Sequence, residues 1–329
     1  MYKTCLQASK FVVDVRAVCI WEENSSERGR EFLRGFDFEY FRHVANICAG
    51  NSDGEKRHAA ALSLRMTYSQ ALESLFAFLC AFIQAPHCVH GWLTTYQNCE
   101  LYSLVEDISK RRKVYSVLPM NPITWEDLAS IVHEHCKPGN IKPEDVIRSF
   151  GQMWRRLAKD FLNKTLRAEY NSIKHGLRAI PGGSVLTCGE YGSDKEMVCV
   201  GNHEFGSSFP VMKSIGKSKL DFIIRQEYRS WSPAHLASRI HLISMSLNNI
   251  IGRLRLSLEE PAENVRFRVP QSINGFNSPW ADSMAHVEFH GVSYNIPELV
   301  PSTEVEILSS YPSPPAQNEI KNRRRHQLR

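Results

Sequence analysis

HAAALSLRMTYSQALESLFAFLCAFIQ, residues 58–84, is the strongest helix signal in the chain. It is rich in alanine and leucine and contains no glycine or proline, so a long unbroken helix is predicted. From Leu72 onward the helix is apolar almost all round, which predicts a position at the centre of a bundle. Arg65, Ser69 and Glu73 follow one line along it at intervals of four residues. They indicate either a half-buried carboxylate with a partner or a solvated edge.

Further helices are predicted on both sides of this segment. Their starts are marked by cap residues or proline, such as Thr124 before two acids and Pro143 at a first turn. The helix opening at Pro143 can continue as far as His175, with Gly151 as a weak point. The predicted helices cover residues 31–49, about 99–113, 124–136, 143 onward and 233–258.

A β-prone region is predicted after the Pro181-Gly182-Gly183 break. Short runs at 185–191 and 196–204 suit a hairpin, and runs at 209–213 and 220–226 suit two more strands, with a helix open for the last. Two other segments are considered for strands: FVVDVRAVCIW near the start, where a short buried helix is the alternative, and residues 285–294.

The predicted fold class is therefore mostly α: a helical bundle with a small inserted antiparallel β region and a disordered C-terminal tail. The predicted divisions are a bundle core at 1–180, the β insertion at 181–230, a returning bundle helix at 231–260, an irregular region at 261–300 and a disordered basic tail at 301–329.

The net charge of +5 is located in the last nine residues. KNRRRHQLR, residues 321–329, holds five Lys or Arg and no acid, and the rest of the chain has 35 basic and 35 acidic residues. A generally basic nucleic-acid-binding surface is therefore not supported, and such a role needs a local patch or the tail.

The nine cysteines are scattered and include no CxxC pair, which favours reduced thiols and a cytoplasmic protein. No apolar run is long enough to span a membrane, so no membrane partner is expected. Two clusters contain residue types that can bind zinc: His87-Cys88-x-His90, with Cys80 and Cys99 nearby, and His133-Glu134-His135-Cys136. Neither has structural-zinc spacing, and no Walker loop, GxGxxG or HExxH occurs, so no metal or cofactor is predicted.

The stretch with the most suggestive chemistry is KTLRAEYNSIKHGLR, residues 164–178. On a helix, one polar face would carry Lys164, Arg167, Asn171, Lys174, His175 and Arg178. The opposite side would carry Leu166, Tyr170, Ile173 and Leu177. Arg167 and Lys174 could bind a phosphodiester, Asn171 could position it, and His175 titrates near neutrality and could transfer a proton. The alternative is a solvated basic face near a helix C-terminus.

Two segments, RMTYSQALESLFAFLCAFIQAP and NSIKHG, give the chain a resemblance to the HEPN superfamily of helical proteins. The resemblance covers about residues 30–180 and the helix at 233–258. The resemblance implies a bacterial protein that binds RNA and acts in antiphage defence or in a stress response. It also implies that the protein cleaves RNA without a metal, in an active site shared across a homodimer. In the RNxxxH form of the family's ribonuclease motif, His175 matches the histidine and Asn171 matches the polar residue that follows the arginine.

This chain departs from that signature at the arginine. Tyr170 occupies its place, and seven residues separate Arg167 from His175. The site is expected to comprise His175, Arg167, Asn171 and Lys174, supported by Arg65 and by Glu73, which could pair with Lys174 or Arg167. The alternative is a non-catalytic interaction protein with an unidentified protein partner. In that case the polar face of residues 164–178, which contains Lys174-His175-Gly176, is a structural surface or binds the partner.

Overall fold

The computed structural model describes residues 6–51, 56–182, 184–188, 198–214 and 222–281. The chain divides into two compact units. The first comprises Met1–Phe209 and Tyr228–Glu288, and the second comprises Pro210–Glu227 and Phe289–Arg329. The first unit holds all the helices discussed below.

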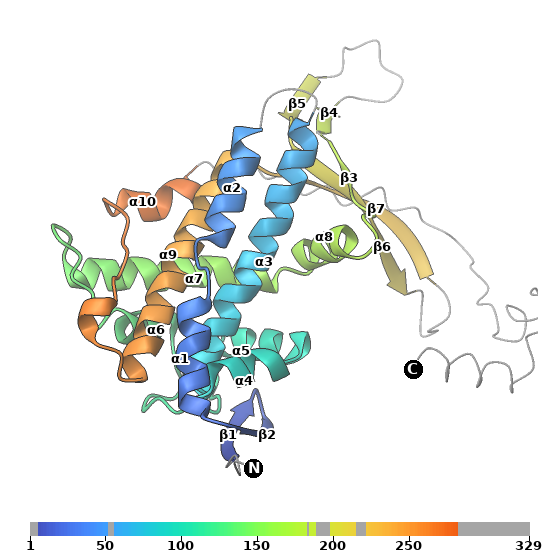
Figure 1. Cartoon of the computed structure of the whole chain (residues 1–329). Coiled ribbons are helices and arrows are strands. Elements are labelled where there is room, and N and C mark those ends of the chain that lie inside the picture. Colours follow the sequence, from blue (N-terminus) through green and yellow to red (C-terminus); the bar gives the residue numbers. More distant parts are fainter. Residues whose placement is uncertain (1–5, 52–55, 183, 189–197, 215–221, 282–329) are drawn as a thin grey trace, which may run out of the picture. The chain divides into compact units, whose positions relative to one another are not determined.

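The long helix α3 (Arg57–Gln84) lies at the centre of the helical unit, as predicted (Figure 1). It contacts α2, α4, α5, α7, α8 and α9, and its residues from Leu75 to Gln84 are all buried. By length and composition it could cross a membrane, but most of its apolar window is covered by neighbouring helices, as in the core helix of a soluble protein. Its closest neighbour is α9 (Pro233–Ser257), whose first turn is capped by Ser232.

The remaining helices surround these two. They are α1 (Ser25–Gly35), α2 (Tyr40–Gly50), α4 (Val89–Thr95), α5 (Asn98–Ser109), α6 (Trp125–Val132), α7 (Pro143–Leu162), α8 (Lys164–Lys174), α10 (Asn274–Asn277) and the 3-10 helices η1 (Ala262–Asn264) and η2 (Ser278–Trp280).

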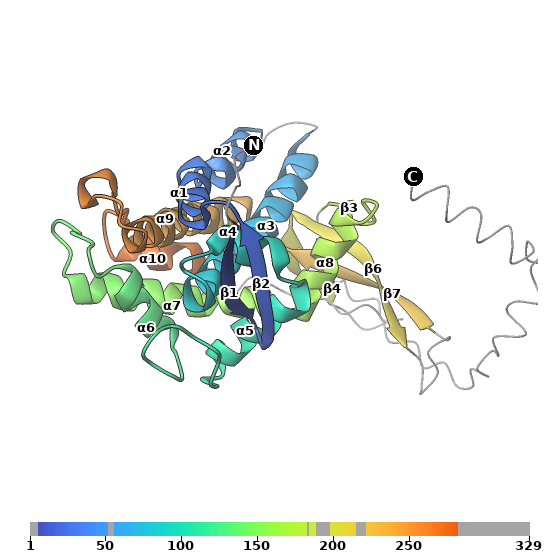
Figure 2. The same cartoon turned by 60° about the horizontal axis from the view of Figure 1, so that its bottom comes forward.

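Within the described residues, the strands form three small sheets. β1 (Gln7–Val13) and β2 (Arg16–Glu22) make an antiparallel N-terminal hairpin, which packs against α3 and α4 (Figure 2). β4 (Ser184–Cys188) and β5 (Val198–His203) also pair antiparallel. The third sheet has the order β3 (Ile180–Pro181), β6 (Gly206–Ser214), β7 (Phe222–Ser230). The fold class of a mostly helical protein with a small antiparallel β region is thus confirmed.

Two predicted helices are each divided in the structure. The segment 31–49 forms α1 and α2, because Phe36 takes an extended conformation and Asp37 accepts a hydrogen bond from the Glu39 amide. The helix from Pro143 ends at Leu162, since Asn163 is extended and caps α8. The predicted hairpin and the strand at 220–226 are confirmed, while the predicted strand at 285–294 and the predicted tail lie outside the described residues.

Candidate functional site

Helix α8 begins after a capping asparagine and ends before a glycine, two residue types that commonly mark the ends of helices. The Asn163 side chain accepts hydrogen bonds from the amides of Thr165 and Leu166 at 2.9 and 3.0 Å, which caps the first turn. At the other end Gly176 has a φ of +88° and Leu177 one of +48°. Both lie in the left-handed region that stops a helix.

Because α8 ends at Lys174, the polar face on the helix is shorter than predicted. His175 is the C-cap residue, outside the helix, with an exposed side chain. Leu177, predicted on the apolar side, is 68% exposed. Arg178 is also beyond the helix, and its amide donates to the Ser172 carbonyl at 2.7 Å. Only the part of the face from Lys164 to Lys174 is helical.

Arg167 and Asn171 line a cavity of about 210 Å³ with Glu73, Tyr102 and Tyr170. The Arg167 guanidinium lies 4.5 Å from the centre of the Tyr102 ring, and the Lys174 ammonium lies 5.6 Å from that of Tyr170. Burial, together with the nearby charge of Glu73, raises the pKa of Tyr170 to about 12, so its phenol stays neutral at physiological pH. His175 is not among the residues that line this cavity.

Glu73 does not form the ion pair with Lys174 or Arg167 that was expected of it. Its Oε1 accepts a hydrogen bond of 3.2 Å from the Tyr96 hydroxyl. The buried carboxylate of α8 is Glu169, which is 0% exposed. Glu169 was missed by sequence reasoning, although its spacing of three and four residues from Leu166 and Ile173 puts it on the buried side.

Arg65 is the partner of Glu169. Its Nε and one terminal nitrogen donate to the same carboxylate oxygen at 3.0 and 2.8 Å. The Ser207 hydroxyl donates to the other oxygen at 2.6 Å. Arg65 also lies 5.2 Å from the centre of the Trp231 ring. These contacts join α3, α8, β6 and Trp231, which lies between β7 and α9. Arg65 also lines a second cavity.

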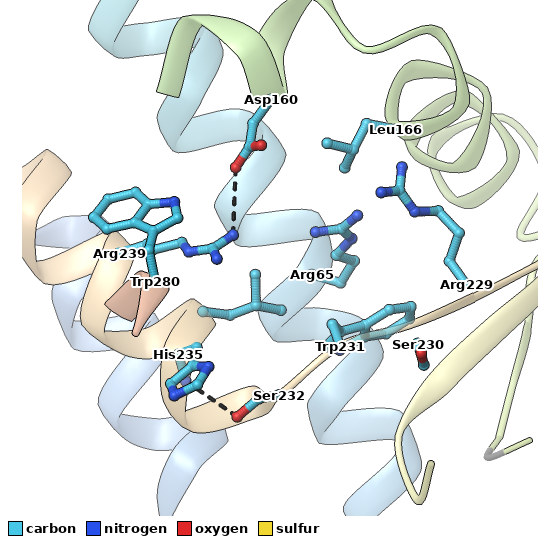
Figure 3. A pocket seen from close by; sticks show the side chains of 11 residues that line it. Arg65, Asp160, Leu166, Arg229, Ser230, Trp231, Ser232, His235, Arg239 and Trp280 are labelled. Carbon is cyan, nitrogen blue, oxygen red and sulfur yellow. Dashed lines mark hydrogen bonds and ion pairs between the residues drawn. The ribbon is translucent and has the colours of Figure 1, made fainter. Parts of the chain in front are cut away.

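The second cavity, about 240 Å³ in volume, has the more strongly cationic lining of the two. Figure 3 shows the guanidinium groups of Arg65, Arg229 and Arg239 gathered between Asp160 and Leu166 on one side and Trp231 and Ser232 on the other. Within the described part of the chain, the residues that line it are Arg65, Asp160, Leu166, Arg229, Ser230, Trp231, Ser232, His235, Leu236, Arg239 and Trp280. We call it the three-arginine cavity.

Contacts with the protein hold Arg239 and Arg65 in place. Arg239 forms an ion pair with Asp160 at 3.3 Å, donates twice to the Pro279 carbonyl at 3.2 Å and lies 4.9 Å from the centre of the Trp280 ring. Arg65 is held by Glu169 as described. Rigid guanidinium groups lose little conformational freedom when they bind a ligand, so the cavity is preorganised.

The lining also contains neutral donors. The Ser230 hydroxyl and the Trp231 indole nitrogen are buried and have no hydrogen-bond partner among the described residues. Buried polar groups are normally satisfied, so both atoms are suited to a bound polar ligand. Ser232, the N-cap residue of α9, is in the lining as well, and a helix N-terminus adds positive potential.

The sequence analysis named Arg65 only as a supporting residue of the site on α8, and it missed Arg229, Trp231, His235, Arg239 and Trp280. Two signals were available. Arg229-Ser230-Trp231 places a cation and an indole directly before the α9 cap, and Arg239 interrupts the apolar stripe formed by Leu236 and Ile240. Neither signal shows that the three arginine side chains line the same cavity. Comparisons of the chain with family models, curated proteins and solved structures found no match.

Proposed function

We propose that this protein binds RNA or a nucleotide in the cytoplasm, through a phosphate held in the three-arginine cavity. The observation that carries the proposal is the lining: among the described residues, three guanidinium groups and two indole rings surround one cavity with a single carboxylate, Asp160. Arginine binds phosphate through paired charge-assisted hydrogen bonds, and indole rings stack on bases.

The size of the cavity supports a small ligand. A volume of about 240 Å³ is slightly below the range of roughly 300–1,000 Å³ that is usual for small-molecule pockets. One nucleotide, or the phosphorylated end of an RNA strand, suits this space better than a duplex. The HEPN resemblance of the two helix segments adds RNA and a defence or stress setting to the proposal.

A binding experiment with matched ligands tests the proposal. A short RNA with a 5′-phosphate, the same RNA with a 5′-hydroxyl, and a nucleoside monophosphate are titrated, with indole fluorescence and calorimetry as readouts. We expect the phosphorylated forms to bind at least about tenfold more tightly, since hydrogen bonds to charged groups contribute about 1.5–3 kcal/mol each. Equal binding of the two RNAs would contradict the proposal.

Matched variants locate the binding. Arg229→Gln removes one guanidinium from the lining and should weaken phosphate binding about tenfold or more. Arg148→Gln makes the same change on α7 at a side chain that is 63% exposed and should leave binding unchanged. If both variants weaken binding equally, the effect comes from net charge and not from the cavity.

Metal-independent RNA cleavage is a second candidate function, favoured by Arg167 and Asn171 lining one cavity. His175 would have to reach RNA from its exposed position at the end of α8, including RNA held by a second copy of the chain. The test compares cleavage of labelled RNA in EDTA by the wild type and His175→Ala. General acid–base catalysis is worth about 10²–10⁴-fold, so equal rates would remove His175 from any reaction.

A further inference from the structure

Glu22, Cys88 and His90 bring three metal-ligand atoms together at the N-terminal hairpin. Glu22 ends β2, Cys88 is the N-cap residue of α4, and His90 lies in the first turn of α4. Their carboxylate, thiol and imidazole atoms all lie within 4.8 Å of one another. The sequence showed only the Cys88-x-His90 pair, because Glu22 is 66 residues away from Cys88.

The distances suit ligands arranged around one point. The Cys88 Sγ is 3.8 Å from Glu22 Oε1 and 3.9 Å from His90 Nε2, and Nε2 is 2.9 Å from both carboxylate oxygens. Zinc bonds of about 2.0–2.3 Å place tetrahedral ligand atoms roughly 3.3–3.8 Å apart. The thiol therefore needs little movement, and the imidazole and carboxylate need to separate by about half an ångström.

The same nitrogen of His90 faces both of the other groups, which argues against a catalytic triad. In a thiol–imidazole–carboxylate relay, the carboxylate holds one ring nitrogen and the opposite nitrogen faces the thiol. Here Nε2 faces Glu22 and Cys88 together. This arrangement converges on a single position, as metal ligands do.

The surroundings bury the three groups to a large extent and hold the Glu22 carboxylate in place. Cys88 is completely buried, and the side chains of His90 and Glu22 are 17% and 11% exposed, which leaves an approach for water as a fourth ligand. The Ser25 hydroxyl hydrogen-bonds the Glu22 carboxylate and contacts the Ser9 hydroxyl at 2.8 Å. Such outer contacts orient the ligands of metal sites.

We propose that Glu22, Cys88 and His90 bind one zinc ion, with water as the fourth ligand. A thiolate, an imidazole and a carboxylate form a donor set that suits zinc. The ion would fasten the β1–β2 hairpin to α4 and stabilise the folded chain, because the three ligands come together only in the native state. This proposal does not depend on the proposed function.

The test uses untagged full-length protein incubated with zinc, freed of excess metal and analysed by mass spectrometry for bound zinc. We expect one zinc per chain and, after cobalt replacement, a sulfur-to-cobalt charge-transfer band. Glu22→Gln, Cys88→Ser and His90→Gln should each weaken zinc binding more than tenfold. The thermal midpoint of the wild type should rise with zinc, and these variants should lose that rise.

A surface cysteine provides the control. Cys99→Ser changes an exposed thiol on α5 and should keep one zinc per chain and the cobalt band. Glu22→Gln keeps the test valid if Cys88→Ser does not fold, since it replaces a partly exposed carboxylate with an amide of the same size. The proposal is overturned if the wild type binds no zinc, if zinc binding survives unchanged in the three ligand variants, or if Cys99→Ser loses it as they do.

Discussion

At the level of single residues, the Arg65–Glu169 pair is the most consequential contact of α8. The two side chains are 5% and 1% exposed. Removing one partner of a buried pair leaves a charge without compensation, which typically costs about 3–5 kcal/mol. We therefore predict that Glu169→Ala lowers the free energy of unfolding by about 3–5 kcal/mol, as measured by urea denaturation.

A surface pair serves as the comparison. Arg155 and Glu126 are 45% and 33% exposed, so Glu126→Ala should cost no more than about 1 kcal/mol. The double variant Arg65→Met/Glu169→Leu should recover much of the loss, because two well-packed apolar residues leave no buried charge. Equal losses for Glu169→Ala and Glu126→Ala would show that burial does not govern the Arg65–Glu169 pair.

His133 makes stability depend on pH. Its Nδ1 lies 2.8 Å from the Ala129 carbonyl, and its Nε2 lies 3.1 Å from Asn249 Nδ2. Asn249 also accepts from the Arg268 amide through its oxygen, so its amino group faces the imidazole, and Nε2 accepts a hydrogen bond. Burial lowers the pKa of His133 from an ordinary value of 6.5 to about 4.

The sign of the effect follows from this lowered pKa. Above pH 6.5 neither the folded nor the unfolded chain protonates His133, and between pH 6.5 and 4 only the unfolded chain does. We predict that stability falls by about 2 kcal/mol between pH 7 and pH 5 on account of this residue. Denaturation curves for His133→Gln should show a much shallower dependence, and His135→Gln, at a side chain 54% exposed, should behave as the wild type. A pH dependence unchanged in His133→Gln would contradict the assignment.

The partner of Arg65 shows what residue patterns can and cannot predict. The line of Arg65, Ser69 and Glu73 along the central helix indicated that the Glu73 carboxylate could be half-buried and need a partner, but the buried carboxylate that forms an ion pair with this helix is Glu169. Its pairing with Arg65 depends on how α8 is rotated against α3, and the two residues are 104 positions apart in the sequence. That rotation is set by packing and by the Asn163 cap, and no local pattern reports it.

At the level of elements, Gly151 allows α7 to pack closely on α6. A Cβ atom at this position would lie 3.0 Å from the Cα of Glu126, in the first turn of α6. Alanine gains about 1 kcal/mol in helix propensity, but overpacking against backbone costs about 1–3 kcal/mol. We predict that Gly151→Ala lowers the unfolding free energy by about 1 kcal/mol, measured by denaturant titration.

Gly35, the last residue of α1, supplies the matched substitution. A Cβ atom there meets nothing within 4 Å, so Gly35→Ala should leave stability unchanged or raise it by less than about 1 kcal/mol. If Gly151→Ala stabilises the protein as much as Gly35→Ala, the close approach of α6 and α7 has no energetic importance.

Gly151 and Asn163 also explain why the predicted helix ended in the wrong place. Glycine is a poor helix former, yet α7 continues through Gly151 because tertiary packing there requires a residue without a side chain. The break falls at Asn163, whose side chain caps the next helix. Helix existence and class were predictable from spacing, whereas the choice between two breaking residues depended on a contact with α6.

At the level of the whole molecule, the candidate ligand cavity could not be read from any one segment. The three arginines come from α3, the end of β7 and α9, and Trp280 comes from η2. The fold class was predictable because the long apolar run of α3 requires other helices to cover it. The three-arginine cavity was not predictable from the sequence, because it depends on where the helices and strands around α3 end.

The central position of α3 leads to a prediction about cooperativity. Among the described elements, α3 packs against α2, α4, α5, α7, α8 and α9 and against strands β1 and β3, so its middle can open only if the packing of most of the helical unit is lost. We predict that amides of residues 72–81 exchange most slowly, with a free energy of opening close to that of global unfolding. Helix α8 is buried on one side only, and its end at Lys174 is exposed. Its amide hydrogens should therefore exchange through smaller, local openings.

Hydrogen exchange followed by mass spectrometry distinguishes these two regimes. With increasing urea, the α3 peptides should show exchange that tracks global unfolding, while the α8 peptides should show exchange that depends little on urea until the transition is near. Glu169→Ala should speed exchange in α8 more than its global effect requires, because it releases the contact between α8 and Arg65. Peptides of α3 exchanging as fast as those of α8 would contradict the central role of α3, since a helix enclosed by its neighbours cannot open before them.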